Sequence, residues 1–355
     1  MAAKKLLDVP RYLVDLQEPA DGSRWDSLLT DRWAVRAAEG LCNEVESQLA
    51  EGVPAPIKAL IKFAVNGTHA MFGSYRDDIN AWSEWAVGDT SSVAVGNLMY
   101  EIMSVARRAG RLMGYSGLCT SVAFQKPHFG MLHARNLDWP LEGMRNSSIL
   151  IDFVGAPAGP YTAVSVPGCV GVVSGCAKGR FSLSLNQAPA TQSPSIFAVP
   201  AFTSATFLLR EVFESCHTYE EAFEVLEHSS TPFPCFVQIV GAKKGEAAVV
   251  EISPGSTSGT YAFEGEPLGI TNHFLDDEDF EDDEWEEDGE DYVTDSLPRL
   301  HSVERAAQRC KPKSLAAAFA PVSRYPVMNE NTVQSMIMHP KSGTVLLQKT
   351  RGGER

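Results

Sequence analysis

The sequence lacks the features that would place it in a membrane or on nucleic acid. No window approaches the roughly 18 uncharged apolar residues of a transmembrane helix. The N-terminal stretch MAAKKLLDVPRYLVDL has no apolar core of the kind a secretion signal needs. Lys and Arg do not gather into a basic patch that could neutralise phosphates. We therefore expect a cytoplasmic protein that binds no nucleic acid and has at most peripheral contact with a lipid surface.

The seven cysteines also lack the spacing of a metal site or a disulfide framework. Their number is odd, and they include neither a close C-x-x-C pair nor a Cys/His cluster. A chain of 355 residues without a secretion signal is expected to keep its thiols reduced. We predict no metal and no organic cofactor, and we interpret Cys169 and Cys176 as packing residues.

Negative charge is abundant but local. The net charge is −15, and the segment DDEDFEDDEWEEDGED, residues 276–291, carries 13 carboxylates. This composition is typical of a solvated insertion loop. Repulsion of anionic lipids or attraction of cations is the alternative interpretation of the acidic loop 276–291.

The hydrophobic pattern changes along the chain from a helical to a strand-like period. Residues 1–118 are mainly helical by apolar spacing, for example over 55–73 and 91–114. Beyond residue 119, short strands alternate with turns and enclose a helical pair at 203–216 and 218–230. Thr218 and Glu221 form a capping-box pattern at the start of the second helix. The order predicts a layered α+β domain.

Cys119 differs from the other cysteines because of its surroundings. It lies in GYSGLCTSVAFQKPHFGMLHARNLDWP, residues 114–140, with Arg135 and Asp138 placed 16 and 19 residues further on. A free thiol has a pKa near 8.5, so a nucleophilic cysteine needs a positive charge or a base beside it. Cleavage before Cys119 would supply an α-amine with a pKa of about 7.7–8.0 on the nucleophile itself. The plain alternative is a core cysteine beside an Arg–Asp surface pair.

Other polar residues near Cys119 have simpler interpretations. The hydroxyls of Thr120 and Ser121 could orient a substrate, but residues of this kind are more often ordinary members of a strand. His128 is expected in a solvated turn. His133 is expected on a strand as a structural residue rather than as the partner in a Cys–His dyad.

Six segments in collinear order resemble the acid ceramidase and N-acylethanolamine acid amidase family of N-terminal nucleophile (Ntn) cysteine hydrolases. They are PRYLVDLQEPADGSRWDSLL, GNLMYEI, CTSVAF…HARNLDW, GCAKGRFSLSLNQ, FLLREVFESCHTYEEAFEVL and ITNH. This family is related to choloylglycine (bile-salt) hydrolases and penicillin acyltransferases. The resemblance covers most of the chain.

The resemblance implies a four-layer αββα sandwich preceded by a mainly helical N-terminal segment. It also implies a precursor that cuts itself before Cys119. Residues 1–118 would become a helical subunit and residues 119–355 the catalytic subunit, and the two fragments would stay associated.

The resemblance further assigns functional residues by position. The catalytic set comprises Cys119, Arg135, Asp138, Asn272 and Arg299, and the substrate-binding set comprises Asn186, Gln187 and His273. Cys119 would be the nucleophile and new N-terminus, and Asn272 would stabilise the oxyanion. The chain departs from the family at Gln187, where the acid ceramidase branch has Glu, and this change bears most on self-processing.

The expected function is hydrolysis of a linear N-acyl amide, such as a fatty-acid amide, an N-acylethanolamine or a ceramide, at near-neutral pH. Two alternatives remain open on the sequence. An acyltransferase would pass the acyl group to an amine instead of water. A non-catalytic homologue that binds a lipid or a partner is favoured only by Gln187.

Overall fold

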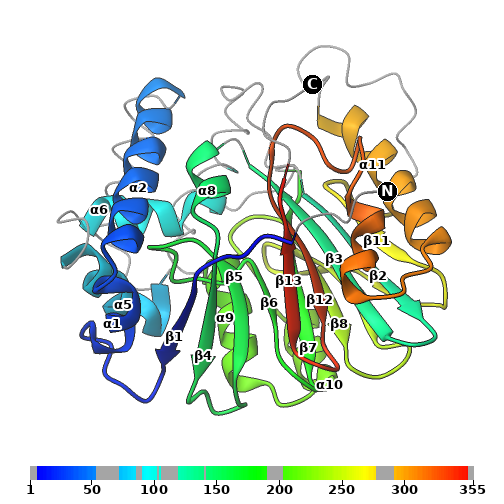
Figure 1. The fold of residues 1–355 in the computed structure, drawn as a ribbon, viewed down its shortest axis with the longest axis horizontal. Coiled ribbons are helices and arrows are strands. Elements are labelled where there is room, and N and C mark those ends of the chain that lie inside the picture. Colours follow the sequence, from blue (N-terminus) through cyan, green and yellow to red (C-terminus); the bar gives the residue numbers. More distant parts are fainter. Residues whose placement is uncertain are drawn as a thin grey trace.

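Two β-sheets stacked face to face form the centre of the molecule, and helices cover their outer faces (Figure 1). The computed structural model describes residues 6–52, 72–84, 90–101, 104, 119–139, 141–189, 203–276 and 292–350. The layers follow the αββα order, so the expected fold class is confirmed. The expected helix at 55–73 and the acidic loop 276–291 lie almost wholly outside the described residues.

The larger sheet has eight strands and is antiparallel except at one edge. Its spatial order is β1 (Arg11–Asp15), β4 (Ile149–Val154), β5 (Tyr161–Ser165), β6 (Ser174–Cys176), β7 (Phe181–Gln187), β8 (Cys235–Gly241), β9 (Ala247–Ser253) and β10 (Ser256–Ala262). The edge strand β1 runs parallel to β4, with Tyr12 opposite Ile151. The N-terminal segment therefore contributes a strand to the same sheet as the downstream segment.

The smaller sheet has five antiparallel strands and carries Cys119. Its order is β11 (Leu268–Ile270), β2 (Cys119–Lys126), β3 (Gly130–Asp138), β12 (Thr332–His339) and β13 (Thr344–Gln348). A tight turn joins β2 to β3, where Gly130 has a φ of 79° that favours glycine. This hairpin folds the two halves of the stretch 114–140 onto each other.

Apolar side chains fill the space between the sheets and beneath the helices. Met336, Met338 and Leu347 of the smaller sheet pack against Leu150 and Val164 of the larger one. On the outer face of the larger sheet lie α9 (Ala205–Ser215) and α10 (Tyr219–Glu227). On the outer face of the smaller sheet lie α11 (Tyr292–Arg309) and the 3₁₀ helix η5 (Leu315–Val322).

The predicted cap of α10 is present. The Thr218 hydroxyl accepts a hydrogen bond from the Glu221 backbone nitrogen at 3.1 Å. The Glu221 carboxylate in turn accepts from the backbone nitrogen of His217 at 2.7 Å. The first contact satisfies an N–H group that the helix start leaves without an intrahelical partner, and the second ties the residue before the cap to the first turn.

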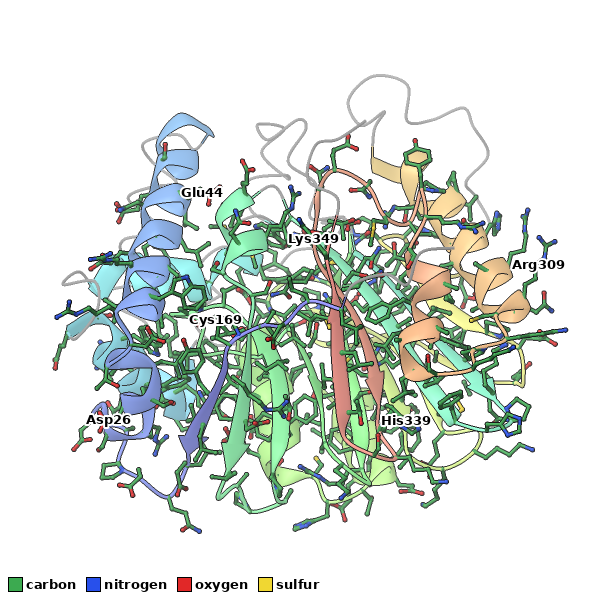
Figure 2. All side chains as sticks on the ribbon, viewed as in Figure 1. Asp26, Glu44, Cys169, Arg309, His339 and Lys349 are labelled. Atoms are coloured by element: carbon green, nitrogen blue, oxygen red, sulfur yellow. The ribbon has the colours of Figure 1, made fainter. Side chains whose placement is uncertain are left out.

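The N-terminal helices gather at the β1 edge of the larger sheet (Figure 1). They are η1 (Ser23–Trp25), α1 (Asp26–Leu29), α2 (Arg32–Gly52), η2 (Gly73–Tyr75), α5 (Arg76–Trp82) and α6 (Thr90–Asn97). On α2, Glu44 accepts hydrogen bonds from the backbone nitrogens of Glu142 and Gly143, at the start of the short helix α8 (Glu142–Asn146; Figure 2). No helix among the described residues is long and apolar enough to cross a bilayer.

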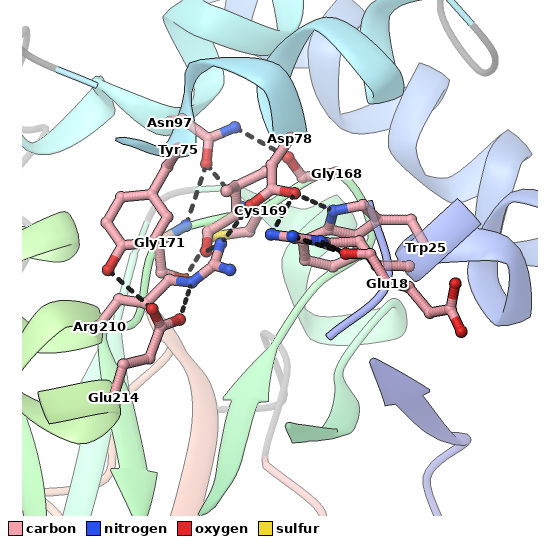
Figure 3. A network of polar contacts seen from close by, with 12 residues as sticks. Glu18, Trp25, Tyr75, Asp78, Asn97, Gly168, Cys169, Gly171, Arg210 and Glu214 are labelled. Atoms are coloured by element: carbon pink, nitrogen blue, oxygen red, sulfur yellow. Dashed lines mark hydrogen bonds and ion pairs between the residues drawn. The ribbon is translucent and has the colours of Figure 1, made fainter. Parts of the chain in front are cut away.

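A buried charge network joins these helices to α9 (Figure 3). Arg210 of α9 forms an ion pair with Asp78 of α5 at 3.0 Å, and both side chains are fully buried. Asp78 also accepts a hydrogen bond from the Trp25 indole at 2.8 Å. Glu214 accepts from Arg210 at 2.7 Å and from Tyr75 at 3.1 Å. The N-terminal segment is therefore held to the rest of the chain by charge as well as by apolar packing.

Replacing one partner of this network is expected to destabilise the whole molecule. Asp78→Ala removes the fully buried one of the two carboxylates that pair with the Arg210 guanidinium, which should lower the free energy of unfolding by about 3–5 kcal/mol. Chemical denaturation followed by fluorescence measures the loss. The control is Lys243→Met, which removes an exposed ion-pair partner and should change little. A loss no larger than that of the control would contradict the assigned role.

Candidate active site

Cys119 is the first residue of β2, and the hairpin with β3 brings Arg135 to it. In the register of the two strands, Cys119 lies opposite Leu137 and Ser121 lies opposite Arg135. Arg135 Nη2 lies 3.5 Å from Cys119 Sγ, and both side chains are buried. The spacing that singled out these residues in the sequence is thus the spacing of a two-stranded hairpin. A permanent positive charge faces the sulfur.

Two backbone carbonyls hold the Arg135 guanidinium in place, one in the loop before β6 and one in β7. Its Nη1 donates to the Val173 carbonyl at 2.9 Å, and its Nη2 donates to the Leu185 carbonyl. Burial lowers the pKa of Arg135, but a guanidinium stays protonated in proteins. The hydrogen bonds to the two carbonyls therefore orient the positively charged Arg135 guanidinium toward the Cys119 sulfur.

Asn272 and Arg299 hold the backbone of Cys119. The Cys119 nitrogen donates to Asn272 Oδ1 at 2.9 Å, and Arg299 Nη1 donates to the Cys119 carbonyl at 2.7 Å. Arg299 Nη2 also donates to Asn272 Oδ1 at 3.0 Å, while Asn272 Nδ2 donates to the Gln187 carbonyl at 2.7 Å. The Thr120 hydroxyl accepts from Arg299 at 2.9 Å, so it positions Arg299. These contacts fix the nitrogen that becomes an α-amine if the preceding bond is cut.

Asp138 lies one residue beyond Leu137, the cross-strand neighbour of Cys119. Burial raises the pKa of Asp138 to about 6, against the opposing effects of Arg299 and of hydrogen bonds from Thr332 and Asn329. The Asn329 amide donates to Asp138 Oδ2 at 3.1 Å. The Asp138 carboxyl therefore changes charge between mildly acidic and neutral pH.

An apolar cavity of about 120 Å³ opens beside Cys119. One wall comes from α2 and α6, and another comes from Leu137, Trp139 and the loop 166–173. Cys169, which lies between the N-terminal helices and the strands in Figure 2, lines the cavity. The cavity therefore exists only where the N-terminal and downstream segments meet. The described residues contain no cluster of His, Cys, Asp or Glu side chains arranged to bind a metal ion.

Only one of the three residues expected to bind substrate lines this cavity, and that residue is Gln187. Its Nε2 donates to the Ser104 hydroxyl at 3.2 Å. Asn186 instead donates to the carbonyls of Ile270 and Thr271, both at 3.0 Å, and so supports the turn that carries Asn272.

His273 points into a polar cluster outside the cavity. Its Nδ1 lies 2.8 Å from the Ser296 hydroxyl, and burial, with Arg299 second, lowers the pKa of His273 to about 4. Asn186 and His273 thus lie behind the cavity wall, where they pack around the catalytic set rather than contact the cavity.

The remaining histidines of the opening motif behave as structural residues. His128 is exposed in the β2–β3 turn. His133 is buried between the sheets, where its ring nitrogens lie 2.8 Å from Ser121 Oγ and 2.9 Å from Ser182 Oγ. Burial lowers the pKa of His133 to about 3, so it stays neutral. Neither histidine lines the cavity.

Asn97 is a site residue that the sequence did not identify. It lines the cavity and binds the loop 166–173 with both ends of its amide: Nδ2 donates to the Gly168 carbonyl at 2.8 Å, and Oδ1 accepts from the Val170 nitrogen at 2.7 Å (Figure 3). The same loop leads to Val173, whose carbonyl orients Arg135. The segment GNLMYEI contained the signal, but only the fold shows which loop Asn97 binds.

Comparisons with known proteins find relatives that are similar in sequence. A family model described as acyl-coenzyme A:6-aminopenicillanic acid acyl-transferase matches residues 199–337. The N-acylethanolamine-hydrolyzing acid amidase of Caenorhabditis elegans is 24% identical over 337 residues, which cover 93% of this chain and 88% of that protein. The acid ceramidase of Balaenoptera acutorostrata scammoni is 23% identical over 264 residues, which cover 68% of this chain and 63% of that protein.

A solved structure of a Caenorhabditis elegans N-acylethanolamine-hydrolyzing acid amidase ortholog is 25% identical, with a TM-score of 0.49. The match covers 63% of this chain and 93% of that structure. The αββα sandwich with a cysteine at the start of β2 is the arrangement expected of an Ntn-type hydrolase. The chain is similar in sequence to the N-acylethanolamine acid amidases and acid ceramidases, and these similarities support the Ntn-hydrolase family.

Loss of the Asn97 amide should loosen the loop 166–173 and, through Val173, the Arg135 guanidinium. Asn97→Ala leaves buried backbone groups without partners and should lower the free energy of unfolding by about 1–3 kcal/mol. It should also slow alkylation of Cys119 by iodoacetamide, since Arg135 no longer faces the sulfur. The control is Gln308→Ala, which removes an exposed amide. Wild-type stability and alkylation in Asn97→Ala would contradict this role.

Proposed function

We propose that this protein is a self-processing cysteine amidase that hydrolyses linear N-acyl amides with an apolar acyl group. The observation that carries the proposal is the position of Cys119 Sγ at the wall of an apolar cavity, 3.5 Å from the Arg135 guanidinium. The fatty-acid amide, N-acylethanolamine and ceramide types are the substrates to test first, because relatives are named for the latter two.

Self-processing begins with the thiol of Cys119. Sγ attacks the carbonyl carbon of Leu118, the acyl group moves from nitrogen to sulfur, and the nitrogen takes up the thiol proton. Water then hydrolyses the thioester, which leaves a carboxylate on Leu118 and a free thiol and α-amine on Cys119. Leu118 lies outside the described residues, whereas Asn272 and Arg299 hold the groups that follow it.

Turnover uses the new α-amine as the base. It takes the thiol proton as Sγ bonds to the substrate carbonyl carbon, and we assign the stabilisation of the oxyanion to the Asn272 amide. Loss of one such donor typically lowers the rate by about 10²–10³-fold. The α-ammonium returns the proton to the leaving nitrogen, so the amine departs neutral. A water molecule that gives its proton to the α-amine then cleaves the thioester and releases the acid.

The lining of the cavity suits an uncharged, apolar acyl group. Its lining is mainly aliphatic and aromatic, and its polar side chains include Asn97 and Gln187, both already engaged with the protein. The described lining residues carry no positive charge that would pair with a second carboxylate on the acyl chain. A straight or aromatic hydrocarbon group fits these surroundings.

Acyl transfer to an amine is the second candidate, and the matching family model, described as an acyl-transferase, favours it. The two reactions share the thioester and differ only in whether water or an amine attacks it. Product analysis with a competing amine separates them. A non-catalytic homologue, the remaining alternative, would leave Cys119 unreactive toward a thiol probe.

Cleavage before Cys119 should be visible in the mass of the protein. We expect wild type to yield fragments 1–118 and 119–355, and Cys119→Ala to remain whole, since the nucleophile of the cleavage is gone. The fragments should co-elute in size exclusion, because the Asp78–Arg210 pair and the shared cavity hold them together. Intact mass and denaturing electrophoresis after incubation across pH provide the measurement.

The same pair of proteins tests the amidase reaction. Cys119→Ala should lose about 10⁴-fold or more of the turnover of N-acylethanolamines, ceramides and N-acyl amino acids. Equal turnover by wild type and Cys119→Ala would eliminate the proposal. A wild-type chain that stays whole at every pH yet hydrolyses amides at full rate would refute the α-amine as base.

Activity should rise as the pH increases from mildly acidic to neutral. Asp138, whose pKa burial raises to about 6, is neutral below that value and ionised above it. The α-amine acts as a base only when unprotonated, and α-amines have a pKa of about 7.7–8.0. A pH profile of kcat/KM measures the titration of the Asp138 carboxyl and of the α-amine. Asp138→Asn should abolish the rise in kcat/KM near pH 6. A profile that peaks below about pH 5 and vanishes at neutral pH would overturn this assignment.

A further inference from the structure

Gly96 occupies a helix position at which glycine is unfavourable. It lies in the last turn of α6 (Thr90–Asn97), one residue before the loop-binding Asn97, and its backbone is not left-handed as that of a helix-ending glycine would be. Glycine destabilises a helix interior relative to alanine, because it loses more backbone entropy on folding. A glycine at such a position usually has a local reason.

Neither of the two usual reasons applies to Gly96. Its φ is not positive, so an L-residue with a side chain could adopt the same backbone conformation. A Cβ atom placed on it would meet no atom of the described residues within 4 Å. Gly171 is different, since a Cβ there would lie 2.5 Å from Thr206 Oγ1. Close packing therefore excludes a side chain at Gly171 but not at Gly96.

The open space beside Gly96 belongs to the cavity next to Cys119. Val93, Gly96, Asn97 and Tyr100 all line that cavity. Val93 precedes Gly96 by three residues on α6, so the two lie on the same face of that helix. A side chain at residue 96 would therefore take up volume on the face that lines the cavity.

We propose that the missing side chain at Gly96 determines how long or bulky an acyl group the cavity accepts. The proposal rests on the amidase function proposed above and adds a specificity residue to it. The N-terminal segment then selects the acyl group, whereas the downstream segment supplies the nucleophile.

The opposite wall cannot be adjusted as readily. Gly168 also lines the cavity, but its φ of 85° favours glycine, and a Cβ there would lie 3.3 Å from the Ala38 Cβ. A side chain at Gly168 would strain the loop that Asn97 holds. Gly96 is thus the position where the cavity can be filled without disturbing the backbone.

The test compares Gly96→Ala and Gly96→Leu with Gly40→Ala. Gly40 is a matched control, since it lies inside α2, is exposed, has open space over its Cα and does not line the cavity. Calorimetry measures the binding of straight-chain acids from butyric to palmitic, the products of the proposed reaction. The same acyl series, presented as amides, gives kcat/KM.

We expect Gly96→Ala to weaken the longest acids by about fourfold and Gly96→Leu by about 10²-fold, because each excluded methylene loses its burial. Butyric acid should bind as in wild type. Gly40→Ala should leave the whole series unchanged. Both alanine variants should raise the unfolding midpoint by about 1–2 °C, which shows that each protein is folded.

The binding measurements and the turnover measurements can contradict the two proposals independently of each other. If wild type hydrolyses no amide, the amidase proposal falls, and the acid series still reports on Gly96. If Cys119→Ala abolishes turnover but both Gly96 variants keep the wild-type length profile, the amidase stands and the specificity role of Gly96 is wrong. A folded wild type that binds no acid of any length would overturn that role as well.

Discussion

The Arg299 guanidinium holds the site together, because it connects three parts of the fold at the backbone of Cys119. Arg299 comes from α11 and donates to the Cys119 carbonyl, to the Thr120 hydroxyl and to Asn272 Oδ1. The outer helix layer, the start of β2 and the turn after β11 are thereby fixed relative to one another. Charge-assisted hydrogen bonds in a buried site are strong and directional, so the Cys119 nitrogen keeps its orientation toward Asn272.

The sequence predicted the elements that local pattern determines. The sequence pattern predicted short strands separated by a turn after Cys119, and their pairing as a hairpin explains why Arg135 follows Cys119 at its observed spacing. Thr218 and Glu221 gave the start of α10. The helix α11 was not predicted, since Pro298 interrupts its pattern and the acidic run adjoins it.

Contacts between distant segments were beyond the reach of local pattern. Nothing near Asp78 indicates that Arg210 is its partner, and nothing near Asn97 indicates the loop 166–173. Family resemblance suggested a catalytic set that stays a prediction, and it grouped Asn186 and His273 with the substrate residues. Both lie behind the cavity wall, because residues adjacent in a strand or turn point to opposite sides. Side-chain direction therefore separates Gln187 from Asn186.

The surroundings of residue 187 favour Gln over the Glu that the acid ceramidase branch has at this position. Its side chain lies in an apolar cavity, where an ionised carboxylate would lose its hydration without a cation among the described lining residues. An amide avoids that charge and donates to the Ser104 hydroxyl, which a carboxylate could not do. Asn272 binds the backbone carbonyl of Gln187 and not its side chain, so the change from Glu to Gln leaves this contact intact. In the proposed mechanism the base is the α-amine of Cys119, and for that reason the mechanism does not require a carboxylate at this position.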